Sequence, residues 1–241
     1  MNNQIEQFKL DLKCASKAQD YIIERFGDLG LDSLFNIGFC PPASSYGFDL
    51  INGRIVVPIY DVYGSYIAFA GRRIDDYSSG VKTFYKLKSD NLEAIQKFLK
   101  WKSSKWLNTP YKKRDNLYNL NNAKKYIFEK GYCFVVEGYF DAIHLHKLGF
   151  KNVVGLGGVV LSDRHCELIY RYCNKIVIML DGDNSGQVAT RKSQIKANEH
   201  NIFTNIVELP KDTDPDSLTI DQLNFIDKMV SESDEELMIK I

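Results

Sequence analysis

The chain has 241 residues and a mass of 27.7 kDa, enough for one or two domains that fold around their own cores without disulfides or structural metals. With 44% hydrophobic and 26% charged residues, its composition is that of a globular protein and excludes a largely disordered, collagen-like or membrane-spanning chain. The formal net charge is zero, but residues 82–114 carry a net charge of +8 and residues 205–241 a net charge of −7. Such asymmetry is typical of a basic segment that binds nucleic acid beside an acidic segment that binds metal, and also of solvated helix faces.

The first half of the chain gives few signals of regular structure. Residues 1–13 mix amides, acids and lysines and lack the apolar segment of a secretory signal, so we expect a cytoplasmic protein. Residues 54–69 (RIVVPIYDVYGSYIAF) predict two strands of an antiparallel hairpin around an Asp-Val-Tyr-Gly turn, with Pro58 at an edge or strand end. Apolar residues within 92–101 recur at helical spacing and predict a helix whose other face carries lysines.

The second half alternates predicted strands with predicted helices. Strands are expected over 133–136, 152–156, 175–180 and 204–209, and helices over 141–148, 162–173 and 187–198. A last helix is expected from the capping-box pattern of Thr219 and Gln222. Such alternation predicts a parallel sheet. The expected fold class is therefore α/β, with an α+β basic subdomain over 1–124, a Rossmann-like parallel βα subdomain over 125–218, and a C-terminal helix with an acidic tail over 219–241.

Acidic residues recur where the predicted strands end. Glu137 ends the first strand of this half, Asp181-Gly-Asp183 ends the third, and Asp214-Pro-Asp216 follows the fourth. Ligands of open α/β sheets bind beyond the carboxyl ends of the strands, and neighbouring carboxylates repel one another unless a cation neutralises them. Hard oxygen ligands suit Mg²⁺ or Mn²⁺, so we interpret these residues as a divalent-metal site for phosphoryl transfer. Each acidic segment alone is also an ordinary turn former.

Other candidate motifs carry less chemistry. Gly155-Leu-Gly-Gly158 lacks both the dinucleotide fingerprint and the P-loop lysine, and indicates only a tight strand-to-helix turn. His144 and His146 are two residues apart on a predicted helix and do not share a face, so we expect surface or packing roles. The five cysteines never form a Cys-x-x-Cys pair, which favours free thiols over a disulfide framework or a zinc ribbon.

The acidic motifs belong to longer segments with a fixed order. In the second half these segments are Val135-Val-Glu137-Gly-Tyr-Phe-Asp141, Leu156-Gly157, Asp181-Gly-Asp183 and Asp214-Pro-Asp216. In the first half they are Pro58-Ile-Tyr-Asp61, Phe69-Ala-Gly71-Arg72, Lys105-Trp-Leu-Asn108-Thr-Pro110 and Leu117-Tyr118. Together they resemble the catalytic core of bacterial or phage DnaG-type DNA primases, whose second part is a Toprim domain. Other Toprim enzymes share the carboxylates but not the segments of the first half.

The resemblance implies a nucleotidyltransferase that makes short RNA primers on single-stranded DNA from ribonucleoside triphosphates during DNA replication. It implies catalytic roles for Glu137, Asp181 and Asp183, which would hold Mg²⁺ or Mn²⁺ with the help of Asp214 and Asp216. The residues implied to contact template and nucleotide phosphates are Arg72, Lys105, Asn108 and Lys113.

The resemblance also sets expectations about partners. DnaG-type primases normally carry a zinc-binding domain and a domain that docks on the replicative helicase, and we expect neither in this chain. A helicase and a separate zinc-binding module are therefore expected partners, and so short a form would suit a bacteriophage or mobile element. Two alternatives stay open: a Toprim nuclease that uses the same carboxylates, and a non-catalytic replisome module that binds single-stranded DNA.

Overall fold

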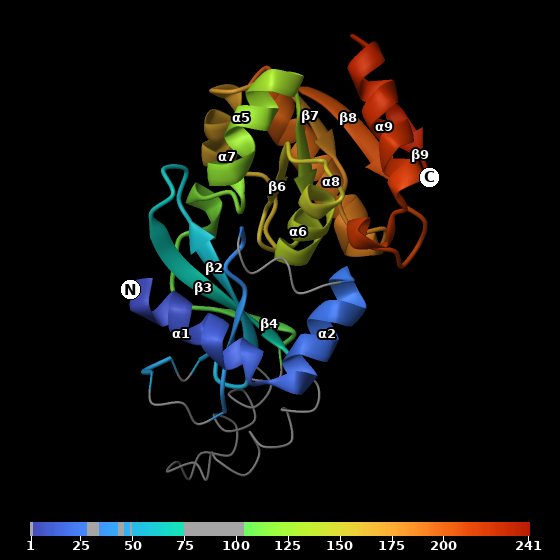
Figure 1. Cartoon of the computed structure of the whole chain (residues 1–241). Coiled ribbons are helices and arrows are strands. Elements are labelled where there is room, and N and C mark those ends of the chain that lie inside the picture. The colour runs from blue at the N-terminus through green and yellow to red at the C-terminus, as the bar shows by residue number, and fades with distance from the viewer. Residues whose placement is uncertain (1, 28–33, 43–45, 49, 75–103) are drawn as a thin grey trace, which may run out of the picture. The chain divides into compact units, whose positions relative to one another are not determined.

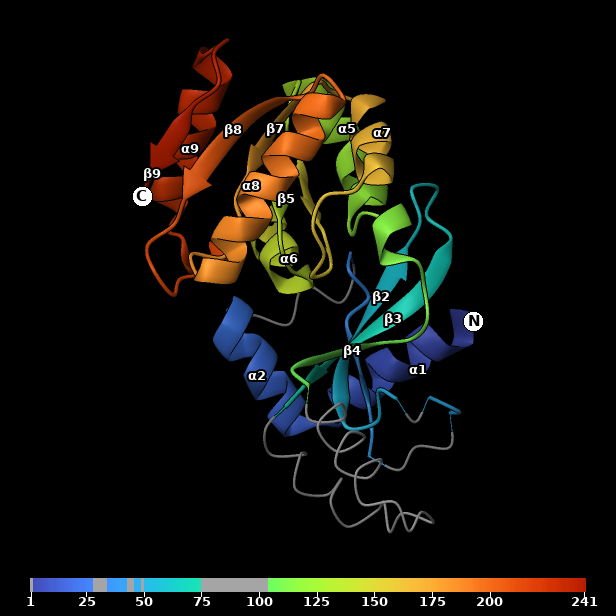
Figure 2. The ribbon, with the colours of Figure 1, turned by 180° about the vertical axis from the view of Figure 1, so that it is seen from behind.

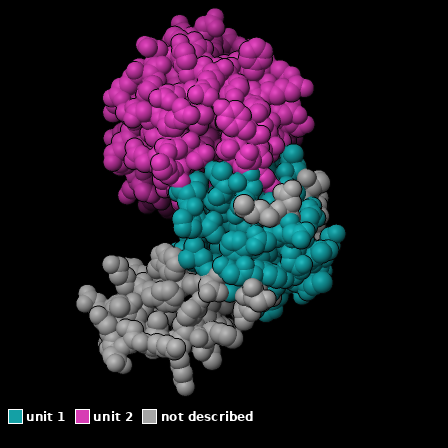
Figure 3. Space-filling view, turned by 90° about the vertical axis from the view of Figure 1, so that its left-hand side faces the viewer, with its two compact units in different colours: residues 1–59, 66–111 teal, residues 60–65, 112–241 magenta. Residues whose placement is uncertain are grey.

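The computed structural model describes residues 2–27, 34–42, 46–48, 50–74 and 104–241 (Figure 1). These residues fall into two compact units, coloured separately in Figure 3: Met1–Ile59 with Tyr66–Tyr111, and Tyr60–Ser65 with Lys112–Ile241. The helix predicted over 92–101 lies outside the described residues. The three-part division at residues 124 and 218 stays a prediction, because compactness alone does not define the bounds of a domain family.

The first unit contains a four-stranded sheet and two N-terminal helices. Its elements are α1 (Asn2–Lys13), α2 (Ser16–Phe26), β1 (Gly38–Cys40), β2 (Arg54–Tyr60), β3 (Tyr66–Arg73) and β4 (Trp106–Asn108). The strand order is β1-β2-β3-β4, with antiparallel pairing of β1 to β2 and of β3 to β4. Strands β2 and β3 are neighbours joined by a short turn, which confirms the predicted hairpin.

The core of this unit lies between α1 and the sheet. The ring of Phe8 meets the ring of Phe69 on β3 edge to face, with centroids 5.1 Å apart and an interplanar angle of 82°. Pro58 lies inside β2, which has neighbours on both sides, and not at the edge or strand end expected for it. Because β1 pairs with β2 only from Arg54 to Val56, the absent N–H of Pro58 removes no hydrogen bond to β1.

The turn between β2 and β3 belongs to the second unit. The carboxylate of Asp61 accepts hydrogen bonds from the backbone N–H groups of Tyr63 and Ser65, both at 2.9 Å, and these bonds fix the turn. Val62 packs against the hydrophobic core of the second unit, and Lys124 Nζ donates to the Val62 carbonyl at 2.9 Å. The second unit is therefore assembled from two separate stretches of chain.

The second unit is a parallel sheet covered by helices on both faces. Its strands are β5 (Cys133–Val136), β6 (Val153–Gly155), β7 (Lys175–Ile178), β8 (Phe203–Glu208) and β9 (Met238–Lys240), in the order β6-β5-β7-β8-β9. Every neighbouring pair of these strands is parallel, which confirms the predicted α/β fold. Its helices are α5 (Leu120–Lys130), α6 (Tyr139–Lys147), α7 (Asp163–Tyr170), α8 (Asn184–Glu199) and α9 (Ile220–Glu232).

Two sets of helices cover the two faces of this sheet. Helices α5, α7 and α8 pack on one face, where Ile127, Ile169 and Ala197 share a core cluster with Val135 and Ile178 of the strands. Helices α6 and α9 lie on the other face, in front of the sheet in Figure 1 and behind it in Figure 2. Strand β7 is buried on both faces, as its uninterrupted apolar sequence predicts. No described helix combines the length and the apolar character needed to cross a bilayer.

The segment expected to be an acidic tail contains the fifth strand. Ile239 of β9 is 5% exposed and pairs with Val207 of β8. The Glu236 carboxylate accepts from the backbone N–H of Thr204 at 3.0 Å, and the Asn205 side-chain oxygen accepts from the Leu237 N–H at 2.8 Å. These contacts hold β9 in the sheet. The strand has three residues and one buried side chain, so its sequence is too short to show the alternation of apolar and polar residues that predicts a strand.

The N-terminus of α9 has the capping box predicted from Thr219 and Gln222. Thr219 Oγ1 accepts from the Gln222 N–H at 3.3 Å, and Gln222 Oε1 accepts from the Thr219 N–H at 2.9 Å. We expect Thr219→Ala to lower the free energy of unfolding by about 1 kcal/mol in urea denaturation, because the end of the helix loses its hydrogen-bond acceptor. Thr219→Ser keeps that oxygen and should match the wild type. An alanine variant of wild-type stability would contradict the capping role.

His146 of α6 is a packing residue, as expected, and its ring must stay neutral. It is 5% exposed, and Asn119 Nδ2 donates both to His146 Nδ1 at 3.1 Å and to the Val153 carbonyl at 2.9 Å. Because an amide nitrogen only donates, His146 Nδ1 accepts, which requires an unprotonated nitrogen there. Burial, followed by the charge of Lys151, lowers the pKa of His146 to about 4.

This lowered pKa makes the protein sensitive to acid. In the unfolded chain the imidazole of His146 has a pKa near 6.5. Between that pH and about pH 4 the unfolded state binds a proton that the folded state does not. The free energy of unfolding therefore falls as the pH falls through this range. Between about pH 7 and about pH 4.5 we expect the wild type to lose about 2 kcal/mol more than His146→Gln in urea denaturation. Glutamine can accept from Asn119 without titrating. Identical pH profiles for the two proteins would contradict this prediction.

Candidate functional site

The predicted acidic residues lie at the carboxyl ends of strands in the second unit. Glu137 directly follows β5, and Asp181 and Asp183 follow β7. Asp214 and Asp216 lie after β8, at the start and in the middle of a short 3-10 turn over Pro215–Ser217. The Gly182 N–H donates to the Thr213 carbonyl at 2.8 Å and ties the turn after β7 to the segment before Asp214.

Gly182 allows the Asp181-Gly-Asp183 turn to lie against the segment that follows β8. A Cβ atom on Gly182 would lie 2.0 Å from the carbonyl oxygen of Pro210 and 3.1 Å from that of Leu209. Both contacts are with backbone, which cannot rotate away as a side chain does. A side chain at position 182 would therefore displace either this turn or the segment after β8.

Asp183 also caps the helix that follows it. Its Oδ1 accepts from the Gly186 N–H at 2.7 Å and from the Ser185 hydroxyl at 2.8 Å. These two hydrogen bonds lower the pKa of Asp183. Helix α8 consequently begins at Asn184, earlier than the predicted residue 187, because its N-cap belongs to the acidic motif.

Asp181 is the electrostatic centre of the carboxylate cluster, which consists of Glu137, Asp141, Asp181, Asp183 and Asp214. Its Oδ1 is buried and has no hydrogen-bond partner among the residues that the structure describes. Burial raises the pKa of Asp181 to about 8, with further contributions from the negative charges of the other four members. A carboxylate in this setting is stabilised by a nearby cation.

The donor set of this cluster suits a hard divalent cation. Among the residues that the structure describes, no three His, Cys, Asp or Glu side chains are already arranged as a complete ligand set. Mg²⁺ does not require one, because it usually keeps several waters and binds one or two protein carboxylates together with substrate phosphates. An all-oxygen cluster with a buried, unpartnered carboxylate oxygen fits that mode of binding.

Asp141 joins the cluster although it was not among the expected ligands. It lies in the first turn of α6, is 7% exposed, and its Oδ2 accepts from the Gly138 N–H at 2.7 Å. An acidic residue three positions after the N-cap residue, here Gly138, is a recognisable capping pattern. That local signal could have predicted its orientation, but its approach to Asp181 depends on the pairing of β5 with β7.

Three of the four residues expected to contact template and nucleotide lie on or beside β3 and β4 in the first unit. Lys105 directly precedes β4 and is exposed, and Asn108 ends β4 and is half-buried. Arg72 is 9% exposed and pairs with Trp106 in the β3–β4 register. Its Nε donates to the Tyr21 hydroxyl at 2.9 Å, and its guanidinium lies 5.5 Å from the centroid of the Trp106 ring. These contacts fix the position of the Arg72 charge.

Lys113, the fourth of these residues, lies in the second unit. It begins a 3-10 turn over Lys113–Asp115, and its Nζ donates to the Gly157 carbonyl at 2.8 Å. Burial lowers the pKa of Lys113. The neighbouring Gly158 N–H donates to the Glu137 carbonyl at 3.1 Å, and φ angles of +67° and +80° at Gly157 and Gly158 confirm the predicted tight turn. Lys113 thus stabilises a loop that contacts the backbone of the carboxylate cluster.

Sequence comparisons relate this chain to known proteins. A family described as Toprim-like matches residues 134–219. The DNA primase of Aquifex aeolicus is 33% identical over 172 residues, which are 70% of this chain and 30% of the relative. That of Rickettsia prowazekii is 29% identical over 220 residues, which are 89% of this chain and 31% of the relative. The chain therefore spans less than a third of the length of these two relatives.

Solved structures match nearly the whole chain. The zinc-binding and RNA polymerase domains of the Aquifex aeolicus primase superpose with a TM-score of 0.76 at 25% identity, covering 95% of this chain and 59% of that one. A DnaG primase catalytic domain bound to single-stranded DNA superposes with a TM-score of 0.73 at 23% identity, covering 95% of this chain and 76% of that one. The similarity of fold therefore includes both units.

Proposed function

Because this chain contains a Toprim domain within a catalytic core of the DnaG primase type, we propose that it synthesises short RNA primers on single-stranded DNA from ribonucleoside triphosphates. The observation that carries the proposal is Asp181, a strand-end carboxylate with a buried, unpartnered oxygen in the field of four other carboxylates. Nucleotidyl transfer brings further negative charge to such a site, and a cation-binding cluster is the feature that this chemistry requires.

In the proposed reaction the 3′-hydroxyl of the primer attacks the α-phosphorus of a ribonucleoside triphosphate and forms a new P–O bond. The bond between the α-phosphorus and the oxygen that bridges it to the β-phosphate breaks, and pyrophosphate leaves with that oxygen. The residues proposed to hold Mg²⁺ or Mn²⁺ are Glu137, Asp181, Asp183, Asp214 and Asp216. A bound cation would favour deprotonation of the attacking hydroxyl and offset the charge of the phosphates. Asp183 is held in place by its hydrogen bonds to the start of α8, so its orientation exists before any ligand binds.

The basic residues are proposed to position the strand and the nucleotide. Lys105 and Asn108 would contact phosphates from β4, and Arg72 would provide a charge whose position Tyr21 fixes. Such contacts align a nucleic acid without reading its sequence. Lys113 would contribute its positive charge from beside the Gly157–Gly158 loop, whose Gly157 carbonyl it contacts. Since the Aquifex aeolicus structure contains a zinc-binding domain, we propose a comparable module, together with a replicative helicase, as partners of this core.

A primer-extension assay tests the proposal without requiring a start site. The substrate is an RNA oligonucleotide annealed to a longer DNA template, incubated with one labelled ribonucleotide, the other three, and Mg²⁺ or Mn²⁺. On a denaturing gel the wild type should lengthen the RNA, and Asp181→Ala should lower incorporation by about two orders of magnitude or more. Lengthening that is the same in both proteins would contradict the proposed role of Asp181.

Two lysines provide a matched test of the basic residues. Lys105→Ala should weaken use of template or nucleotide about tenfold, as expected for one lost phosphate contact, whereas Lys112→Ala, at a side chain 86% exposed, should behave as the wild type. The nuclease alternative predicts a shortened DNA strand without incorporation. The non-catalytic alternative predicts salt-dependent binding of single strands with neither reaction. Either pattern would contradict primer synthesis.

A further inference from the structure

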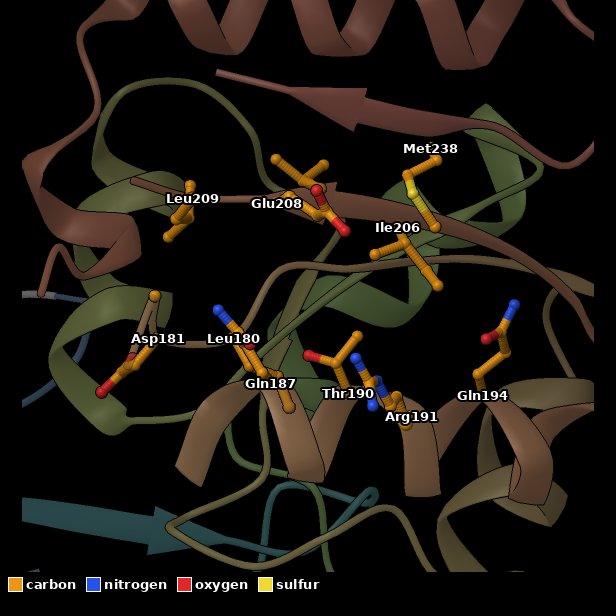
Figure 4. A pocket seen from close by; sticks show the side chains of 12 residues that line it. Leu180, Asp181, Gln187, Thr190, Arg191, Gln194, Ile206, Glu208, Leu209 and Met238 are labelled. Carbon is orange, nitrogen blue, oxygen red and sulfur yellow. The ribbon is translucent and has the colours of Figure 1, made fainter. Parts of the chain in front are cut away.

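A pocket of about 450 Å³ lies between α8 and the strands β8 and β9 (Figure 4). Its volume falls in the range of small-molecule sites. Every residue that lines it belongs to the second unit. None of its side chains apart from Asp181, at one end, takes part in the mechanism proposed above.

The two walls of the pocket differ in chemistry. The strand wall contains the acidic Glu208 and the apolar residues Ile206 and Met238, which are paired in the β8–β9 register and therefore share a face of the sheet. The helix wall is polar and consists of Gln187, Thr190, Arg191 and Gln194. Their spacing places these four residues on one face of α8. The buried residues of α8 are Gly186, Ser193 and Ala197. Gln187 and Arg191 are exposed and Thr190 and Gln194 are half-buried, so the polar row is accessible to hydrogen bonding with a molecule in the pocket.

We propose that this pocket binds a nucleotide. A nucleobase has flat apolar faces, which suit Ile206 and Met238, and polar edges, which suit the amide and hydroxyl groups of α8. Arg191 is the cationic residue of the lining, and a guanidinium binds phosphate through paired hydrogen bonds. No ion pair of Arg191 is found within the described part of the chain. The acidic residue of the strand wall, Glu208, is paired with Lys240 at 3.4 Å, which offsets its repulsion of a phosphate.

The proposed site is separate from the carboxylate cluster. Leu180, Asp181 and Gly182 form one end of the pocket. Figure 4 shows the Asp181 carboxylate directed away from the side chains of α8. A nucleotide in the pocket would therefore lie behind the turn that presents Asp181, and its binding would need neither a bound cation nor primer synthesis.

Calorimetric titration in EDTA tests this inference on the full chain. EDTA removes divalent cations and with them any cation-bridged binding of phosphate at the carboxylates. We expect AMP and GMP to bind, adenosine to bind about tenfold more weakly than AMP because it lacks the phosphate, and inorganic phosphate alone to give no measurable heat. Absence of AMP and GMP binding to the wild type would overturn the proposal.

Three variants locate the binding site. Arg191→Gln should weaken AMP about tenfold and leave adenosine unchanged, whereas Lys192→Gln, at the exposed neighbouring cation outside the lining, should change neither. Met238→Trp should fill the pocket and abolish binding of both ligands. Met238 is 62% exposed, so this variant should keep the melting temperature of the wild type. AMP binding that is unaffected by Arg191→Gln and Met238→Trp would show that the nucleotide binds elsewhere and overturn the proposal.

The two proposals fail independently. A protein that extends primers but binds no AMP in EDTA would contradict the pocket alone. A protein that binds AMP in this pocket but incorporates no ribonucleotide would contradict primer synthesis alone.

Discussion

Replacing Asp181 by asparagine should abolish cation-dependent incorporation of ribonucleotides and should also stabilise the protein in the absence of divalent cations. The Asp181 carboxylate is partly buried, and one of its oxygens has no hydrogen-bond partner within the described ranges of the chain. The four other carboxylates of the cluster all disfavour its charge. Asparagine has almost the same shape and no charge. It therefore removes the repulsion that weakens the folded state and, with it, the negative charge that would attract the cation.

Two measurements on the same variant test this prediction. Incorporation in the primer-extension assay should fall by about two orders of magnitude or more. Calorimetry in EDTA should show a melting temperature about 2–4 °C above that of the wild type, equivalent to about 1 kcal/mol once solvent screening of the partly exposed carboxylate is allowed for. Adding Mg²⁺ should raise the melting temperature of the wild type more than that of the variant, since only the wild type has the full charge of the cluster.

Asp183→Asn is the matched control for this experiment. Asparagine caps helices as well as aspartate does, so the hydrogen bonds from Gly186 and Ser185 are kept. Asp183 is exposed and its pKa is lowered, which means that its charge is already stabilised. We therefore expect loss of incorporation without any gain in stability. A melting temperature for Asp181→Asn that is equal to or below that of the wild type would show that repulsion within the cluster does not destabilise the fold.

Gly182→Ala should damage both the fold and the activity. The added methyl group would lie 2.0 Å from the Pro210 carbonyl oxygen, so either the turn after β7 or the segment after β8 must move. Overpacking against backbone should lower the free energy of unfolding by about 3 kcal/mol. Displacing the Asp181 and Asp183 carboxylates by as little as about 1 Å should lower incorporation about 100-fold.

Gly131→Ala separates this clash from the ordinary cost of replacing a glycine. Gly131 has a φ of +77°, and no atom of the described residues lies within 4 Å of an added Cβ, so backbone strain opposes the substitution. We expect a loss of about 1 kcal/mol and normal incorporation. Gly182→Ala with the stability and activity of the wild type would show that the turn adapts to a side chain.

Much of the second unit could be predicted from the sequence because its signals are local. Strands β5 and β7 contain uninterrupted apolar runs, and the cap at Thr219 uses residues within one turn of the chain. The position of Asp181 after a buried strand followed from the same pattern. Pairing of parallel strands then brings their carboxyl ends to one edge. Glu137, Asp181, Asp183 and Asp214 could therefore be expected near one another from the sequence, whereas Asp141 could not.

The features that the sequence did not reveal depend on residues distant in the chain. Strand β9 is three residues long and exists through its pairing with β8. Arg72 was expected to contact nucleic acid. Its hydrogen bond to Tyr21 joins residues 51 positions apart, and such a contact leaves no periodic or capping pattern in the sequence. Pro58 costs no hydrogen bond to β1 because that strand ends its pairing at Val56, which the sequence of β2 does not show.

Because the second unit is built from two separate stretches of the chain, recombination cannot transfer it as one continuous segment. The Tyr60–Ser65 turn supplies Val62 to the core of that unit and a carbonyl acceptor to Lys124. A recombination event that transferred residues 112–241 alone would leave behind this part of the unit's own packing. Genetic exchange between related proteins should therefore succeed more often when both stretches move together, and substitutions at position 62 should be accompanied by substitutions in the residues around position 124.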